Sequence, residues 1–202
     1  MREEVFLPFP APTRAEVPMA SHVRGTWLAA VVRTMRAGPH FEAYARELDP
    51  SVRGTVLGAI AGDWLPIDVL MDHYAACDRL ALPAEEIAEI GRGALQFAQG
   101  SILALTARVA TQTVTTPWRV LGQLQRFWDR FILGGGVCVY RVGPKEARVE
   151  LVQFPGCRFR HFRVGARSVT QATFDFLCQK AFTSELPKLG SPTSLSVRIA
   201  WV

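Results

Sequence analysis

The chain has 202 residues, 49% of them hydrophobic and 20% charged, which is typical of a globular protein with one sizeable core. No apolar run approaches the roughly 18 residues that a transmembrane helix needs, so we expect no membrane span. The net charge of +5 is scattered apart from one group at 158–167, whereas nucleic-acid-binding proteins concentrate basic residues on one face, so we expect no nucleic-acid partner.

The amino terminus and the cysteines indicate a cytoplasmic protein. Residues 1–18 contain acidic residues and repeated prolines without a continuous apolar stretch, so they make a poor signal peptide. The four cysteines are widely spaced and form no Cys-x-x-Cys pair, which argues against a metal site and favours reduced thiols. We expect an extended, proline-rich arm over 1–18, either loose or docked on its own domain or a partner, and a single domain over 19–202.

Amphipathic helices dominate the first two thirds of this domain. Apolar residues recur at spacings of three and four, and prolines or capping residues stand at several segment starts. Helices are expected from Ser21, Asp49, Leu65, Pro83 and Thr116, the one from Pro83 continuing to Phe97, with a further apolar segment over 101–110. The clearest pattern covers 116–133, where large apolar residues fall on one face: Trp118, Leu121, Leu124, Trp128 and Phe131.

Strands come late in the chain. Glycines at 134–136 end a helix, and two strand patterns, 137–142 and 147–154, flank a turn. A helix over 169–183, capped by Ser168, precedes a final strand over 194–202. Leu195, Val197, Ile199 and Trp201 alternate with smaller or polar residues there, as in a half-buried strand. Helices first and strands late predict an α+β fold: an N-terminal helical layer packed on a small antiparallel sheet of hairpin and C-terminal strand, with a helix between them.

No catalytic or metal constellation is evident. The four histidines, at 22, 40, 73 and 161, are far apart, and no His-x-x-x-His, Glu-x-x-His or Gly-x-Ser-x-Gly motif occurs. Only His73 has an acidic neighbour, Asp72, and adjacent residues on a helix point about 100° apart, so this pair does not orient itself. We expect no enzyme, with a reductase-like activity as a minor alternative.

Two segments are candidates for binding a ligand. The aromatic residues of 116–133 indicate either an apolar cavity or a thick core. The segment 157–167, if extended, places Arg158 and Arg160 on one face, where they could hold a carboxylate or phosphate; otherwise it is a solvated connection. The candidate ligand-binding residues are Trp118, Leu121, Trp128, Phe131, Arg158, Arg160, His161 and Phe174.

The order of several segments carries a resemblance. VRGT (23–26), IGRGAL (90–95), TPWRVLGQL (116–124), the hairpin and the closing strand resemble a largely myxobacterial family of similar length with no assigned function. More distantly, the chain is similar to 4-vinyl-reductase domains, haem nitric-oxide-binding domains and related trafficking-complex subunits. This resemblance implies a helical layer against a small antiparallel sheet, often enclosing an apolar ligand or acyl chain.

The haem branch of that resemblance implies a ligating histidine on the helix after the glycine-containing one, and a Tyr-x-Ser-x-Arg clamp for the haem propionates. Residues 98–118 contain no histidine, and YRVGPK stands at the hairpin instead of the clamp. We therefore expect no haem and no other cofactor.

The leading hypothesis is a non-enzymatic regulatory or sensory domain that binds a small apolar or amphipathic ligand between helix 116–133 and the sheet. The alternative is a dimeric protein–protein interaction or scaffold module with a solid core and no ligand. A homodimer is expected, because related folds pair through their helical layer and the stripes at 27–35 and 52–60 offer more apolar surface than one sheet covers.

Overall fold

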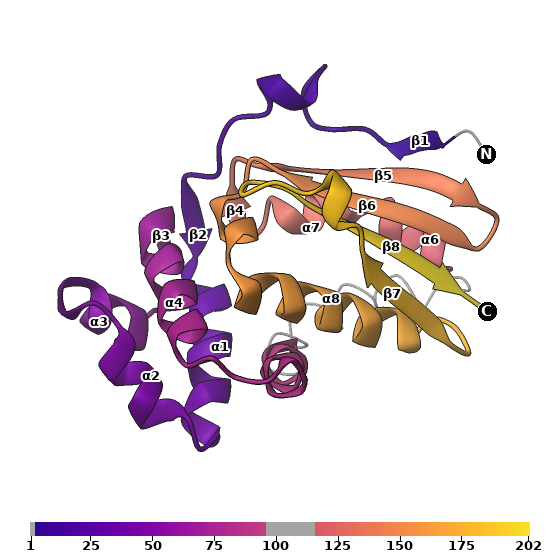
Figure 1. The fold of residues 1–202 in the computed structure, drawn as a ribbon. Helices are drawn as coiled ribbons and strands as arrows, with labels where there is room; N and C mark the ends of the chain where they lie inside the picture. Colours follow the sequence, from indigo (N-terminus) through magenta and orange to yellow (C-terminus); the bar gives the residue numbers. More distant parts are fainter. Residues whose placement is uncertain (1–2, 96–115) are drawn as a thin grey trace.

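The computed structural model describes residues 3–95 and 116–202 and confirms the α+β fold (Figure 1). Its main sheet is antiparallel, with five strands in the order β1-β5-β6-β8-β7. Helices α1 to α4 gather at one end of this sheet, and the two ends of the chain lie at the other (Figure 1). The strands of the main sheet are β1 (Glu4–Leu7), β5 (Gly136–Gly143), β6 (Glu146–Val152), β7 (Ala181–Glu185) and β8 (Leu195–Trp201).

A second sheet joins the helical end to the rest of the chain. It has three short strands in the order β3-β2-β4, namely β3 (Trp64–Pro66), β2 (His22–Arg24) and β4 (Ile132–Leu133). The longer helices are α1 (Gly25–Ala37), α2 (Phe41–Glu47), α3 (Pro50–Leu57), α4 (Ile67–Arg79) and α8 (Arg160–Asp175). Residues 84–95 are also helical, and the shorter elements are α6 (Pro117–Leu121), α7 (Leu124–Trp128), η1 (Arg14–Glu16), η2 (Pro155–Arg158) and η3 (Pro187–Leu189). The expected end of a helix at Phe97 and the apolar segment 101–110 lie outside the described residues.

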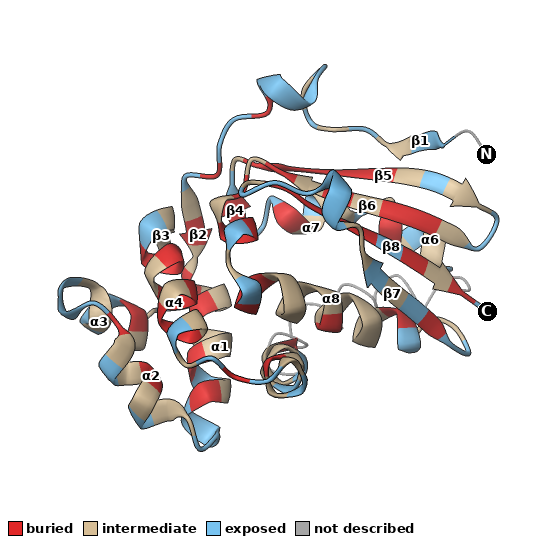
Figure 2. Cartoon of the chain, in the orientation of Figure 1, coloured by how far each residue is buried: buried red, intermediate tan, exposed pale blue. Residues whose placement is uncertain are grey.

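The predicted hairpin and terminal strand share one sheet. Val149 of β6 is paired with Val139 of β5 on one side and Val197 of β8 on the other. The four alternating residues of the last strand are all buried: Leu195, Val197, Ile199 and Trp201. Buried positions concentrate along β5, β6 and β8 (Figure 2), so the centre of the sheet carries much of the core.

The single helix expected over 116–133 is wrong. The helix stops at Leu121, resumes at Leu124 as α7 and ends at Trp128. Tertiary contacts hold the segment after the break: Ile132 pairs with Val23 of β2, and the Gln125 side chain accepts a hydrogen bond (2.7 Å) from the backbone N–H of Val137. The aromatic residues of this segment therefore come from two short helices and the turn that follows them.

Residues 157–167 are neither of the two alternatives considered above, an extended segment or a solvated connection, because α8 begins at Arg160. The helix expected over 169–183 with Ser168 as its cap spans Arg160–Asp175 instead, with Ser168 inside it. The carboxylate of Asp78, at the end of α4, accepts hydrogen bonds from the backbone N–H groups of Arg160 (2.9 Å) and His161 (2.7 Å). A carboxylate at this position satisfies the free N–H groups of a first turn and opposes the helix dipole. A cap that comes from a distant helix leaves no local signal in the sequence.

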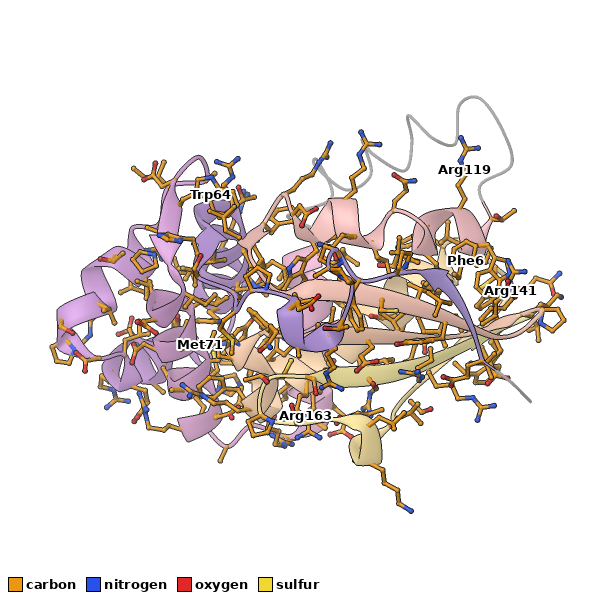
Figure 3. All side chains as sticks on the ribbon, turned by 90° about the horizontal axis from the view of Figure 1, so that it is seen from above. Phe6, Trp64, Met71, Arg119, Arg141 and Arg163 are labelled. Atoms are coloured by element: carbon orange, nitrogen blue, oxygen red, sulfur yellow. The ribbon has the colours of Figure 1, made fainter. Side chains whose placement is uncertain are left out.

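The amino-terminal arm docks on its own domain, one of the alternatives left open above. Strand β1 pairs with β5, and the Phe6 ring packs on Trp118 with centroids 5.0 Å apart. The Arg141 guanidinium lies 4.7 Å from the Trp118 ring centre, and Figure 3 shows Arg141 beside Phe6 at the end of the sheet. Residues Glu4–Leu7 thus form an edge strand of the main sheet.

The apolar stripes behind the homodimer prediction are largely covered within the chain. Leu28, Val32 and Met35 of α1 and Val56 of α3 are buried in the core, whereas Ile60 is 65% exposed. The surplus of apolar surface is therefore smaller than the sequence pattern indicates. None of the helices in residues 3–95 and 116–202 has the length and hydropathy needed to cross a bilayer.

Candidate functional site

A cavity of about 320 Å³ lies between the main sheet and the helices. Helices α1, α4, α6, α7 and α8, together with residues 84–95, all contribute to its lining. This volume falls at the lower end of the range for small-molecule sites, roughly 300–1,000 Å³. Two exposed residues from the α6–α7 region, Arg119 and Gln123, place its rim at the surface.

The floor of the cavity is one face of the sheet. Successive strand residues point to opposite faces, so alternate residues of β6 and β8 face the same side. The floor residues are Val137, Val149, Leu151, Leu195, Val197 and Ile199. On the opposite face of β6, Arg148 and Glu150 form a buried ion pair (3.0 Å) that also binds Glu3 and Arg14 of the arm. The arm therefore covers the charged face and leaves the apolar face to the cavity.

Aromatic side chains form the wall at the helical end. Trp27 of α1 meets Phe131 edge-on with ring centroids 6.0 Å apart, and Phe127 lies 5.0 Å from Phe131. Trp128 also lines the cavity, and its indole N–H donates to the carbonyl of Gly134 (2.8 Å). Rings held on several sides in this way present flat apolar surfaces to whatever occupies the cavity.

Two glycines shape the wall formed by residues 84–95 and α8. A Cβ on Gly91 would lie 3.2 Å from the Cα of Gly165, so glycine at 91 lets these two helices approach closely. A Cβ on Gly165 would meet no atom of the described residues within 4 Å. Because Gly165 lines the cavity, the space beside it is part of the open volume.

The polar groups inside this apolar lining are few, and two of them matter most. The Tyr74 hydroxyl accepts a hydrogen bond from the indole N–H of Trp27 (3.0 Å). His161 is 4% exposed, and its Nδ1 is buried without a hydrogen-bond partner in the described part of the chain. The two rings lie 6.4 Å apart, centre to centre. Burial lowers the pKa of His161 to about 4, so the ring is a neutral imidazole near pH 7.

A second buried histidine lies behind the cavity wall. His73 is fully buried, and its Nδ1 hydrogen-bonds the Tyr44 hydroxyl at 2.7 Å. Burial, with a smaller contribution from nearby His161, lowers the pKa of His73 to about 3. His73 does not line the cavity, and the hydrogen bond to Tyr44 gives it a structural role.

The buried histidines predict that the ligand-free protein loses stability as the pH falls. The ordinary histidine pKa of 6.5 applies to the unfolded chain, so below it the unfolded chain binds protons that folded His73 does not. The unfolding free energy should fall by up to about 1.4 kcal/mol per pH unit for His73, and His161 acts in the same direction. Urea unfolding at about pH 7 and about pH 5 measures this slope. A His73→Gln variant should show a smaller slope; a slope equal to that of wild type would contradict this explanation.

The structure brings four of the eight predicted site residues to the cavity: Trp128, Phe131, His161 and Phe174. The other four do not line it. Leu121 is fully buried in the core, while Trp118 packs between Phe6 and Trp201 and donates its indole N–H to the carbonyl of Pro144 (2.9 Å).

Arg158 and Arg160 are exposed and do not line the cavity, so the candidate anion grip is not part of it. Arg160 donates to the carbonyl of Leu82 (2.7 Å), and Arg158 lies over the Phe159 ring at 4.7 Å. Arg158 ends η2, before α8 begins. Arg160 and His161 are adjacent in α8 and point about 100° apart, so they do not face the cavity together.

Sequence reasoning missed Trp27, Tyr74 and Gly165 as cavity residues. Trp27 and Tyr74 fall on apolar helical stripes, which a core explains equally well, so the pattern could not separate lining from core. Gly165 carries no pattern of its own. Among the described residues, no group of three or more His, Cys, Asp or Glu side chains could hold a bare metal ion.

No family model matches the chain, and no curated protein matches it in sequence, so the narrower resemblance to a myxobacterial family stays a prediction. Solved structures do match in fold. One is an oxygen-binding H-NOX domain related to soluble guanylate cyclases, in its oxygen complex, with 13% identity and a TM-score of 0.60 over 88% of this chain and 94% of that one.

Two further solved structures are similar to the same extent. An H-NOX protein variant from K. algicida in the unliganded Fe(II) state has 8% identity and a TM-score of 0.60, covering 89% of this chain and 96% of that one. An H-NOX structure from work on haem distortion has 12% identity and a TM-score of 0.60, covering 88% and 94%. At these identities the likeness concerns the fold.

These comparisons contradict the expectation of no cofactor, because two of the solved structures that share this fold come from work on haem redox potential and haem distortion. That expectation rests on the lack of histidine in residues 98–118, most of which lie outside the described residues. A search confined to one helix misses a histidine on another element. His161 lines the cavity of this chain from α8.

Proposed function

We propose that this chain is a non-enzymatic regulatory or sensory domain that binds a small, largely apolar or amphipathic ligand in the cavity between the helices and the sheet. The main observation behind this proposal is the cavity, which has apolar walls and contains the His161 imidazole, whose Nδ1 has no hydrogen-bond partner in the described residues. Pockets of this composition hold apolar molecules, with a few polar groups fixing orientation. A cytoplasmic location, expected from the amino-terminal sequence, is part of this proposal.

A haem-type macrocycle is the ligand class that these residues fit. The sheet floor and the aromatic wall are apolar on either side of the space, and a neutral imidazole is a common ligand of haem iron. When bound, a haem supplies an iron centre that a histidine nitrogen can hold. The chain's own contribution is to surround the ligand with apolar side chains and to keep the imidazole uncharged and in place.

The titratable groups of the lining support a binding role over catalysis. Among the described residues they are Tyr74, Arg119 and His161. Burial raises the pKa of Tyr74 far above neutrality and lowers the pKa of His161 to about 4, so neither exchanges a proton readily near pH 7. A general acid or base works best with a pKa near the operating pH. Arg119 points away from the sheet (Figure 3).

The alternative of a dimeric scaffold module with a solid core has less support, because the core encloses the cavity. A homodimer is compatible with either function and remains a proposal of its own. Its test is light scattering at high protein concentration, where a monomer would remove the idea.

A cavity-filling variant tests the proposed function. Gly165→Leu projects a side chain into the open space beside α8, and leucine favours helical conformation more than glycine does, so the helix should persist. Hemin quenches tryptophan fluorescence on binding, and Trp27 and Trp128 line the cavity as reporters. We expect hemin to bind wild type and Gly165→Leu to weaken that binding at least tenfold.

The matched control is Gly54→Leu. Gly54 lies in α3, outside the cavity lining, and a Cβ there also meets nothing within 4 Å. This variant should bind hemin as wild type does. Equal hemin binding by wild type, Gly54→Leu and Gly165→Leu would place the ligand elsewhere and contradict the proposal.

A further inference from the structure

We propose that His161, in the first turn of α8, is the residue that ligates the iron of a haem bound in the cavity. This inference rests on the proposed function. It adds that the ligand is held from helix α8, by an imidazole nitrogen. It differs from the haem domains that the sequence resembles, in which the ligating histidine is expected on the helix after the glycine-containing one, because residues 98–118 of this chain hold no histidine.

His161 is singled out among the four histidines by its position. The other three have ring partners away from the cavity: His22 with the Ser21 hydroxyl (3.1 Å), His40 with the Glu86 carboxylate (2.6 Å) and His73 with the Tyr44 hydroxyl (2.7 Å). His161 alone of the four lines the cavity. Its buried Nδ1 has no partner in the described residues, and a buried polar atom left unpaired costs free energy that a ligand can recover.

The other donor types do not serve as well. Tyr74 also lines the cavity, but its hydroxyl is engaged by Trp27 and burial keeps it protonated, whereas an iron ligand of this type is a phenolate. No cysteine is among the described lining residues. Arg119 carries a guanidinium, which has no lone pair to offer.

The backbone of His161 is fixed from another helix. The Asp78 carboxylate accepts hydrogen bonds from the N–H groups of Arg160 (2.9 Å) and His161 (2.7 Å), which ties the start of α8 to the end of α4. The ring packs near Tyr74 and His73, with both centroid distances 6.4 Å. A ligand residue held by its supporting shell needs little reorganisation when the metal group enters.

The test uses hemin and the variant His161→Gly in the full chain. Wild type with hemin should show a Soret band shifted from that of free hemin, and an imidazole-type ligand in its electron paramagnetic resonance spectrum. His161→Gly should lose both signatures and bind hemin more weakly, beyond the roughly 10- to 100-fold that removal of an outer-shell partner costs. Added imidazole should restore the wild-type spectrum, which shows that the variant is folded with its cavity intact.

Two variants serve as controls. His22→Ala and His40→Ala each remove a histidine that does not line the cavity, so both variants should retain the wild-type spectrum. Hemin that binds His161→Gly with the wild-type spectrum, or a His161→Gly spectrum that imidazole fails to restore, would overturn the role of His161 and leave the proposed function standing. Hemin that does not bind wild type at all would overturn the ligation outright, while other apolar ligands would still test the cavity.

Discussion

Replacing Trp201 by serine should lower the free energy of unfolding by about 3 kcal/mol or more. Trp201 is 6% exposed in β8, and its ring packs against Trp118 (5.2 Å between centroids) and Phe174 (5.8 Å). Removing a buried tryptophan deletes its apolar contacts and leaves a void that neighbours fill only partly, which typically costs 3–5 kcal/mol. Urea unfolding of the ligand-free protein measures the difference.

Phe176→Ser is the matched control for Trp201→Ser. Phe176 follows α8 and is 71% exposed, so its loss should change the unfolding free energy by less than about 0.5 kcal/mol. A loss below about 1 kcal/mol in Trp201→Ser would mean that the terminal strand does not contribute to the core. Equal losses in the two variants would contradict the packing of β8 as well.

Arg148→Ala should destabilise the fold by about 3 kcal/mol, the second large effect. The Arg148 side chain is 10% exposed and forms ion pairs with Glu3 (2.6 Å) and Glu150 (3.0 Å), beneath which lies the Tyr140 ring at 3.8 Å. Removing one partner of a buried pair leaves an uncompensated charge and costs roughly 3–5 kcal/mol. We expect the lower end, because Arg14 still pairs with Glu150 (2.8 Å).

An exposed ion pair provides the comparison for Arg148→Ala. Arg198 is 53% exposed at its side chain and pairs with Glu146 (2.5 Å). Exposed pairs contribute about 0–1 kcal/mol, so Arg198→Ala should change stability little. If Arg148→Ala lowers the free energy of unfolding no more than Arg198→Ala does, the ion pairs of Arg148 do not stabilise the contact between the arm and the sheet.

The sheet is the part of the fold that the sequence predicts best. The alternation of apolar residues over 194–202 assigns each side chain to one face, because a shift of one residue would turn Trp201 and Ile199 to the other side. The structure places both in the core, with the register that pairs Ile199 with Ala147. The local sequence pattern is sufficient here because side chains alternate between the two faces of a strand, so the positions of the apolar residues determine which face is buried.

The helix boundaries depend on partners that are distant in sequence, and the sequence patterns missed them. The start of α8 is set by Asp78, more than eighty residues before it, and the break after Leu121 is accompanied by pairing of Ile132 with β2. No local propensity encodes a cap donated by another helix. A charged segment with arginines at alternate positions therefore reads as extended when it is helical.

From the sequence, an apolar cavity could be named as one possibility, but the residues that line it could not be chosen correctly. An aromatic stripe at helical spacing cannot say whether it faces a solid core or a cavity, and only some of its members face the open space. In the sequence, His161 groups with Arg158 and Arg160 as a ligand-binding candidate, whereas in the structure His161 lines the cavity and the two arginines do not. Arg160 and His161 are neighbours on a helix and therefore point about 100° apart.

Native mass spectrometry of the full chain mixed with one equivalent of hemin tests the central claim most directly. Binding in the cavity predicts a one-to-one complex with wild type that is depleted in Gly165→Leu and retained in Gly54→Leu, since only the first substitution fills the space beside α8. A spectrum that contains only the mass of the unliganded protein, or the same fraction of complex in all three proteins, would contradict haem binding at this cavity.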